Sequence, residues 1–221
     1  GAAVMSSSGD CYRYWGKAEE GARQEYHLLI YHSLDVAAVG VQLWERDPGL
    51  RKAFVRLSCL AEQTLSHFLP WLLAIHDIGK FGDGFQSLRP DVCESLGRCA
   101  EGHSNTPRHD SIGYQWLCQE IVAGGLIGSE LCSEDLKGRE DLLDCLQPWL
   151  KAVCGHHGMP PDPSAWNLAR DAGKLSGSES AIREFLGLLG TDLFLGPESV
   201  FLGSYETLLL VGSRSSWLLA G

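Results

Sequence analysis

Apolar residues recur at helical spacing along most of the chain, and no alternating run is long enough to predict a strand. This period predicts helices over 25–45, 57–80, 110–126, 141–158, 178–190 and 204–221. Pro70 predicts a break or a new start within the second helix. Pro148 predicts a restart within the fourth, where Gly155 suits the C-terminal cap. The pattern therefore predicts an all-α fold.

Two turn-rich linkers, 86–108 and 158–178, separate these helices, and neither contains a repeat or a low-complexity block. A chain of 221 residues suits one large domain. We expect a tag-like or disordered stretch at 1–10 and a single helical domain with two irregular loop regions over 11–221.

Composition places the chain among soluble globular proteins, with 44% hydrophobic and 21% charged residues. Its apolar stretches fall short of the about 20 residues that span a bilayer, and its N-terminus lacks the basic and apolar regions of a signal peptide. Eight cysteines are scattered without a CxxC pair, which favours reduced thiols. These features predict a cytoplasmic protein without a membrane partner.

The formal net charge of −10 argues against a large surface that binds nucleic acid by releasing counterions. Divalent cations are often the largest local charges in a site. A polyanionic substrate would therefore need bound metal ions, or a partner protein, to approach this chain.

The stretch LLAIHDIGKFGDGFQ, residues 72–86, ends an apolar helix with His76, Asp77 and Lys80. A buried, unpaired charge costs several kcal/mol, so these groups need partners. On a helix all three side chains address one point, because Lys80 lies four residues after His76 and three after Asp77. They suit a metal with a phosphate beside it. The structural alternative is a His–Asp hydrogen bond with the lysine in solvent.

The chain offers four further candidate ligands: His32, His109, His156 and His157. A single histidine near an apolar face is more often a core residue than a ligand. In CGHHG the two adjacent imidazoles reach one metal only if the backbone leaves the helix, which the flanking glycines permit. A helix end capped by histidines is the alternative for that motif.

Five motifs occur in this order in the HD nuclease domain of the CRISPR-associated helicase-nuclease of type I systems, which the chain therefore resembles: YWGK, HLLIYHSLDVAAV, HDIGKFGDGFQ, RHDSIGYQW and GHHG. The resemblance runs from about Tyr12 to Trp217, and the joint order is more specific than any single motif. It implies a helical HD-superfamily domain with one or two divalent transition metal ions (Mn, Ni, Co or Fe). It further implies a metal-dependent endonuclease or exonuclease acting on single-stranded DNA. A helicase domain or subunit and a CRISPR RNA-guided surveillance complex would be its partners.

Carried over motif by motif, the resemblance assigns six metal ligands: His32, His76, Asp77, His109, His156 and His157. Asp77 would bridge two ions, and the last three histidines would hold the second of them. Lys80 resembles the residue that steadies the scissile phosphate, so Asp77 and Lys80 are the candidate catalytic residues. Phe81 and Phe85 are candidates for stacking on unpaired bases, with a place in the core as the alternative.

Two departures from the family pattern bear on activity. No GxxxxGK[ST] phosphate loop is present, so we expect an excised domain or a stand-alone subunit. The family's closing helix carries an aspartate ligand in an Ala-Asp-Trp segment, where this chain reads SRSSW with Ser216 at the aspartate's position. A neutral hydroxyl is the poorer ligand, so the first metal should bind more weakly and activity should be reduced.

Two alternative functions use the same residues. An HD phosphohydrolase acting on nucleotides would need an enclosed pocket with basic groups for the base and sugar, whereas DNA would need an open groove. A non-catalytic adaptor would keep the HD fold but would have lost the metals.

Overall fold

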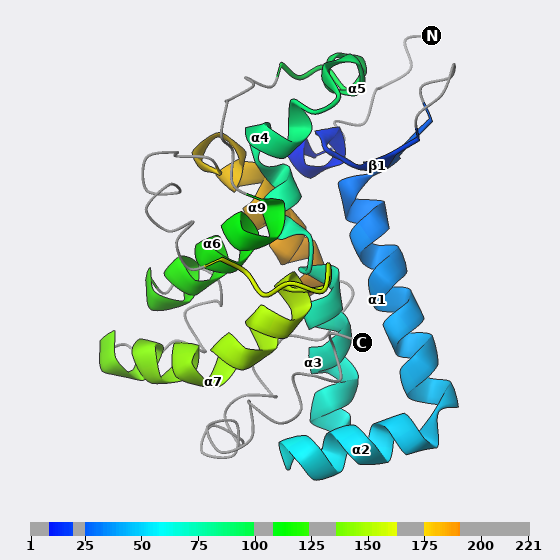
Figure 1. Cartoon of the computed structure of the whole chain (residues 1–221), viewed down its shortest axis with the longest axis vertical. Coiled ribbons are helices and arrows are strands. Elements are labelled where there is room, and N and C mark those ends of the chain that lie inside the picture. Colours follow the sequence, from blue (N-terminus) through cyan, green and yellow to red (C-terminus); the bar gives the residue numbers. More distant parts are fainter. Residues whose placement is uncertain (1–8, 20–24, 100–107, 124–135, 163–174, 191–221) are drawn as a thin grey trace, which may run out of the picture.

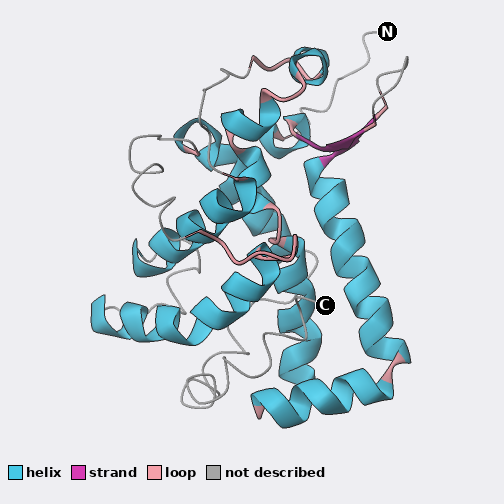
Figure 2. Cartoon of the chain, viewed as in Figure 1, coloured by secondary structure: helices cyan, strands magenta, loops and turns pink. Residues whose placement is uncertain are grey.

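The computed structural model describes residues 9–19, 25–99, 108–123, 136–162 and 175–190. Within these ranges nearly all regular structure is helical, which confirms the predicted all-α class (Figure 2). The predicted helix over 204–221, which includes Ser216, lies outside the described residues. Of the helices in the ranges given above, none is at once long enough and apolar enough to cross a membrane.

The described α-helices are, in chain order, α1 (Leu29–Arg46), α2 (Pro48–Ser58), α3 (Glu62–Ala74), α4 (Asp83–Gln86), α5 (Pro90–Ser95), α6 (His109–Ala123), α7 (Leu136–Cys154) and α9 (Glu179–Leu188) (Figure 1). Shorter 3-10 helices accompany them: η1 (Asp10–Arg13), η2 (Ile78–Phe81) and η3 (Ser176–Ser178). A two-stranded antiparallel sheet, β1 (Trp15–Ala18) with β2 (Tyr26–Leu28), precedes α1.

The hydrophobic pattern does not predict this sheet, which replaces the first turn of the helix expected over 25–45. Its strands have four and three residues, too short for an alternating pattern to be visible. Trp15 pairs with Leu28, and Leu29 N donates to Tyr14 O at 2.8 Å. The sheet therefore fixes the N-terminal end of α1.

Two helix pairs and one short segment make up most of the core, to which α9 adds Ile182 and Phe185. α1 packs on α3, α6 packs on α7, and η2 lies against α6. Figure 1 shows α1 along one side of the molecule, α3 near its centre, and α6 and α7 on the other side. Between them the fully buried Trp149 ring meets the Phe68 ring edge-on, with 5.4 Å between centroids.

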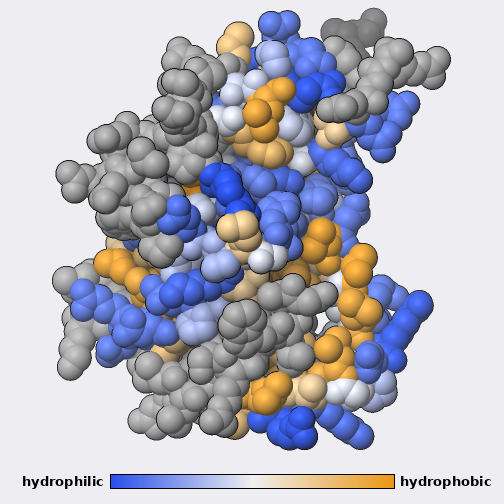
Figure 3. All heavy atoms as spheres, viewed as in Figure 1, coloured by the Kyte–Doolittle hydropathy of each residue, from blue (hydrophilic) through white to orange (hydrophobic). Residues whose placement is uncertain are grey.

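α1 shows why the helical period is strong in the sequence. Ile30, Ala37 and Trp44 recur every seven residues and are buried, so one stripe of the helix faces the core. Val39 and Leu43 are exposed on the same helix. Figure 3 shows hydrophobic side chains gathered along this edge, beside a more hydrophilic central surface.

The prolines and one linker differ from the predictions. Pro70 lies inside α3 and Pro148 inside α7, so neither starts or breaks a helix. Proline inside a helix costs about 3 kcal/mol or more, and the burial of neighbours such as Leu69 and Trp149 offsets that cost. The linker expected over 86–108 contains α5, and α2 lies mostly between the first two predicted helices.

Candidate metal centre

Asp77 lies at the bottom of the site. α3 ends at Ala74, and a tight turn leads into η2, with Asp77 as the residue that precedes it. Ile75 and Ile78 on either side are buried in the core, and the Asp77 side chain is only 1% exposed. A buried carboxylate requires partners, and both oxygens of Asp77 have candidates within reach.

One oxygen of Asp77 faces two histidines and a lysine. Oδ2 lies 3.0 Å from His32 Nε2 and 3.1 Å from His76 Nε2. Lys80 Nζ lies 2.7 Å from the same oxygen and donates to Gly16 O at 3.1 Å. Side chains from α1, from the turn after α3 and from η2 therefore meet at Oδ2.

The other oxygen of Asp77 faces a second group of histidines. Oδ1 lies 3.2 Å from His109 Nε2, at the start of α6, and 3.4 Å from His156 Nε2, just after α7. His157 Nε2 lies 3.2 Å from His109 Nε2. Within each group the ligand atoms fall inside 4.8 Å of one another. The structure thus brings all six predicted ligands together around one carboxylate.

Two glycines set the distance between η2 and α6. A Cβ atom on Gly79 would lie 1.8 Å from His109 O and 2.7 Å from Gly113 N. A Cβ atom on Gly113 would lie 2.8 Å from Gly79 N. These are contacts with backbone atoms, which cannot move aside as a flexible side chain could. Only glycine at these positions lets His109 approach Asp77 this closely.

His156 and His157 reach the same centre because α7 ends before them. The helix stops at Cys154, and the chain turns through GHHG to Gly158, whose φ of +78° is a left-handed conformation that favours glycine. The backbone thus leaves the helix at this motif, which is the condition for both imidazoles to reach one metal. His156 Nδ1 also lies 3.0 Å from Val153 O, a contact that the alternative of a helix end capped by histidines would give as well. The turn allows both imidazoles to face His109 and Asp77.

The hydrogen bonds of His156 make its Nε2 available to a cation. Nδ1 lies 3.0 Å from Val153 O, and because a carbonyl oxygen only accepts, Nδ1 carries the proton of the neutral ring. Nε2 then directs a lone pair at Asp77 Oδ1, a buried oxygen with no hydrogen-bond partner among the described residues. His76 repeats this geometry, with Nδ1 2.7 Å from Leu73 O. Facing lone pairs need a cation between them, so the residues fit a metal.

Burial and charge favour the ligand forms of these groups at neutral pH. Burial alone would raise the pKa of the Asp77 carboxyl, but the surrounding imidazoles, His109 foremost, outweigh it and hold that pKa well below its usual range. Burial lowers the pKa of His156 to about 4. Burial, followed by the neighbouring His109, lowers the pKa of His157 as well. An ionised carboxylate and neutral imidazoles are the forms that bind metal ions.

The ion-free protein should lose stability as the pH falls from about 6.5 to about 4. Folded His156 takes up its proton near pH 4 and the unfolded chain near pH 6.5, so the unfolded state binds more protons in between. Urea unfolding of ion-free protein across this range measures the effect. His156→Gln should flatten the dependence, because glutamine takes up no proton. An equally steep dependence in that variant would show that the ring is not held neutral.

Lys80 and Phe85 line the site beside the histidines. Lys80 is buried, with its ammonium on Asp77 and 5.1 Å from the centroid of the Phe85 ring. The half-buried Phe85 ring also meets His109 edge-on at 5.2 Å between centroids. The roles assigned to these two residues, in holding phosphate and in stacking on bases, stay predictions.

The structure corrects the stacking role assigned to Phe81. Its side chain is 0% exposed and lies between the rings of Tyr14 and Phe185, at 4.8 and 5.9 Å between centroids. No face of the ring is open to a base. Phe81 is therefore a core aromatic, the alternative considered from the sequence.

Gln86, to which the sequence analysis assigned no role, ties the N-terminal strand to the site. Its buried amide donates from Nε2 to Lys80 O at 2.8 Å and to Trp15 O at 2.9 Å. Trp15 Nε1 donates in return to Gln86 O at 3.2 Å. These bonds hold Gly16 where its carbonyl accepts from Lys80. Trp15 belongs to the motif YWGK and Gln86 to the motif HDIGKFGDGFQ, but nothing in the sequence shows that the two residues touch.

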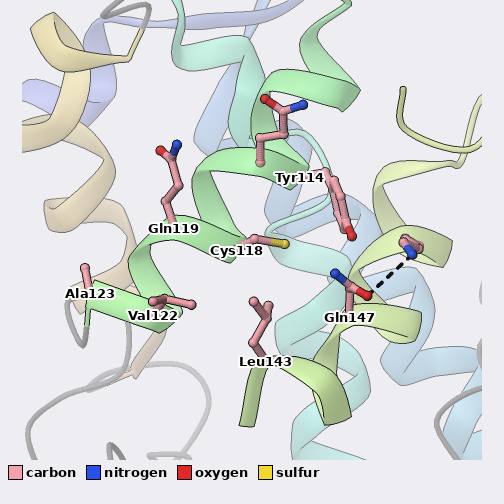
Figure 4. A pocket seen from close by; sticks show the side chains of 9 residues that line it. Tyr114, Cys118, Gln119, Val122, Ala123, Leu143 and Gln147 are labelled. Atoms are coloured by element: carbon pink, nitrogen blue, oxygen red, sulfur yellow. Dashed lines mark hydrogen bonds between the residues drawn. The ribbon is translucent and has the colours of Figure 1, made fainter. Parts of the chain in front are cut away.

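A largely apolar groove lies between α6 and α7 (Figure 4). Its cavity of about 690 Å³ is lined by Tyr114, Gln115, Cys118, Gln119, Val122, Ala123, Leu143, Gln147 and Lys151. Figure 4 shows Tyr114, Cys118 and Gln147 directed toward a common space. None of the six predicted ligands, all of which the structure describes, lines this groove. It is therefore not the enclosed pocket that a nucleotide phosphohydrolase would need at its metals.

The family model described as Cas3, HD domain, matches residues 15–221, which is most of the chain. The chain belongs to the Cas3 HD-domain family. The resemblance inferred from the five ordered motifs is confirmed by this match, and the helical architecture agrees with it.

This Cas3 HD domain corresponds to about a quarter of larger relatives. The CRISPR-associated endonuclease/helicase Cas3 of Escherichia coli (strain K12) is 29% identical over 225 residues, covering 93% of this chain and 25% of the relative. A solved chain described as a CRISPR RNA-guided surveillance complex, pre-nicking, has a TM-score of 0.61 at 22% identity, covering 95% of this chain and 24% of that one. T. fusca Cas3-ADP has a TM-score of 0.58 at 21% identity, covering 94% and 23%. At these identities the solved structures show a shared fold.

Proposed function

We propose that this chain is a metal-dependent nuclease domain that cleaves single-stranded DNA in type I CRISPR interference. The observation that carries the proposal is the Asp77 carboxylate, with two histidines at one oxygen and a three-histidine group at the other. Membership of the Cas3 HD-domain family supports it, as does a relative named as an endonuclease/helicase.

The residues would hold one or two divalent transition metal ions (Mn, Ni, Co or Fe). One ion would lie in the group His32, His76 and Asp77, and the other in the group Asp77, His109, His156 and His157. Imidazole ligands suit these metals, whereas Mg and Ca prefer sites built from oxygen alone. Ions bound there would polarise the phosphodiester and lower the pKa of a water, so that no side-chain nucleophile is needed.

The exposure of the ligands supports an extended substrate. The His32 and His156 side chains are 23% and 25% exposed, whereas Asp77 is 1% exposed beneath them. A DNA strand could therefore lie across the histidine edges while the carboxylate stays out of water. Lys80 would offset part of the Asp77 charge and steady the scissile phosphate, and Phe85 would stack against a base.

Delivery of the strand would depend on other proteins. With a net charge of −10, the chain offers little counterion release to draw DNA to it. We therefore include in the proposal a helicase domain or subunit, recruited by a CRISPR RNA-guided surveillance complex. The chain matches 25% of a relative named as an endonuclease/helicase, and that relative's name supports a helicase as the partner.

Circular single-stranded DNA tests the proposal, since it has no ends and reports endonuclease cuts directly. The ion-free protein should leave the circle intact, and added Mn²⁺, Co²⁺ or Ni²⁺ should start cleavage. Hydrolysis of nucleotides with the circle intact would instead indicate a phosphohydrolase. A chain that binds no metal and cuts nothing would indicate an adaptor.

A further inference from the structure

We propose that Ser111 is a positioning residue for the second metal group, which it serves by holding the His156–His157 turn against the start of α6. The inference rests on the proposed metal centre, and it names a residue outside the six ligands. Ser111 is 2% exposed and lies two residues after His109 on the same helix.

Two side chains of α6 hold Asp162, where the segment that starts with the His156–His157 turn ends. Ser111 Oγ accepts from Asp162 N at 3.0 Å, and Gln115 Nε2 donates to Asp162 O at 3.4 Å. Ser111 and Gln115 are four residues apart, so they share one face of the helix. They therefore bind both backbone polar groups of Asp162, five residues after His157.

Asp110 fixes the direction in which the Ser111 hydroxyl points. The hydroxyl donates to Asp110 Oδ1 at 3.2 Å, and the backbone N–H of Ser111 donates to the same oxygen at 2.6 Å. Arg108 pairs with the other carboxylate oxygen, and Asp110 is 1% exposed. Because the hydroxyl proton points at the carboxylate, the oxygen lone pairs remain available for the N–H of Asp162.

The arrangement gives the turn two fixed ends. One end follows directly from α7, where Gly155 N donates to Lys151 O at 2.9 Å, and the other is bound to Ser111. His157 is exposed between these ends, and its Nε2 faces His109 at 3.2 Å. Since the turn is tied to the helical turn that carries His109, the two imidazoles hold their spacing before any ion binds. Without that bond, ordering the turn would oppose metal binding.

The first metal group does not depend on this bond. His32 and His76 come from α1 and from the turn after α3, and neither forms a hydrogen bond with the residues that hold Asp162. Loss of the Ser111 hydroxyl should therefore act on one metal group alone. A general loss of stability would weaken both.

A Co²⁺ titration of Ser111→Ala tests the proposal. The step of the titration that His157→Ala removes is assigned to the second group. In Ser111→Ala the Co²⁺ affinity of this step should fall about tenfold. The other step should not change. Ser111→Thr keeps the hydroxyl and should recover most of the loss.

Ser58→Ala is the matched control. Ser58 is 1% exposed, and its hydroxyl accepts a backbone N–H, from Leu60 at 3.2 Å, but it lies at the end of α2. This variant should leave both binding steps as they are. Equal weakening of both steps in Ser111→Ala, or no weakening of either, would overturn the proposal.

Amide hydrogen exchange of the ion-free protein gives a readout that needs no metal. Exchange at the N–H groups of Gly158, Met159 and Asp162 should speed up in Ser111→Ala and stay unchanged in Ser58→Ala; Pro160 and Pro161 between them have no N–H. If the parent binds no metal, the proposed function fails while this measurement still tests the positioning role. Unchanged exchange in Ser111→Ala would overturn it.

Discussion

Asp77→Asn should remove both metal ions and reduce cleavage of single-stranded DNA by at least about a thousandfold. Asparagine keeps the shape of the side chain but carries no charge, and its NH2 group would replace one of the two oxygens that face the histidine groups. A bound ion contributes several kcal/mol to the transition state, and 1.36 kcal/mol corresponds to a tenfold change in rate. Metal content per chain and cleavage of circular DNA are the two measurements.

Asp91→Asn is the control for that experiment. Asp91 accepts two hydrogen bonds from Arg89, at 2.9 and 2.8 Å, its side chain is 41% exposed, and it belongs to neither histidine group. The control should keep both the metal and the activity of the parent. Full cleavage by purified Asp77→Asn, free of contaminating nuclease, would show that the site lies elsewhere.

Gly79→Ala should push α6 away from η2, weaken metal binding at the second group about a hundredfold, and destabilise the fold by about 1–3 kcal/mol or more. The added methyl group would lie 1.8 Å from His109 O, so the backbone that carries His109 must move. The first group should keep its ion, since His32 and His76 are not on α6. Urea unfolding and Co²⁺ titration measure the two effects.

Gly187→Ala makes the same chemical change where, outside its own helix and chain neighbours, no atom of the described residues lies within 4 Å of the new methyl group. This position is inside α9, so the variant should gain about 0.5–1 kcal/mol of stability from helix propensity. Should Gly79→Ala fail to fold, Gly113→Ala, with its nearest contact at 2.8 Å, gives a milder test in the same direction. Unaltered binding at the second group in a folded Gly79→Ala protein would show that the close approach is not required.

The hydrophobic period predicted α1, α3, α6 and α7, which carry the six candidate ligands or directly precede them, because buried positions recur along these helices. α1 and α3 were recognisable from residues such as Ala37 and Leu72, which recur among the core positions. The sheet, α5 and the continuous helices through Pro70 and Pro148 were not predicted. These features depend on tertiary packing, which outweighs weak local preferences.

The candidate site was recognisable as a set of residues but not as an arrangement. The motifs named the six candidate ligands, whereas their meeting at Asp77 follows from tertiary contacts such as the packing of α6 on η2 through Gly79 and Gly113. Such a contact joins distant segments and leaves no local pattern. Phe81 and Phe85 show the same limit, since two phenylalanines four residues apart look alike until packing buries one and leaves the other at the site.

Anomalous diffraction from crystals grown with Mn²⁺ or Co²⁺ tests most directly the claim that Asp77 and its histidines form a metal centre. We expect a peak within the group Asp77, His109, His156 and His157, and a weaker one within the group His32, His76 and Asp77, because the sequence motifs predict Ser216 where the family has a further aspartate ligand. A saturated crystal with no peak in either group, or with its ions bound only elsewhere, would contradict the account.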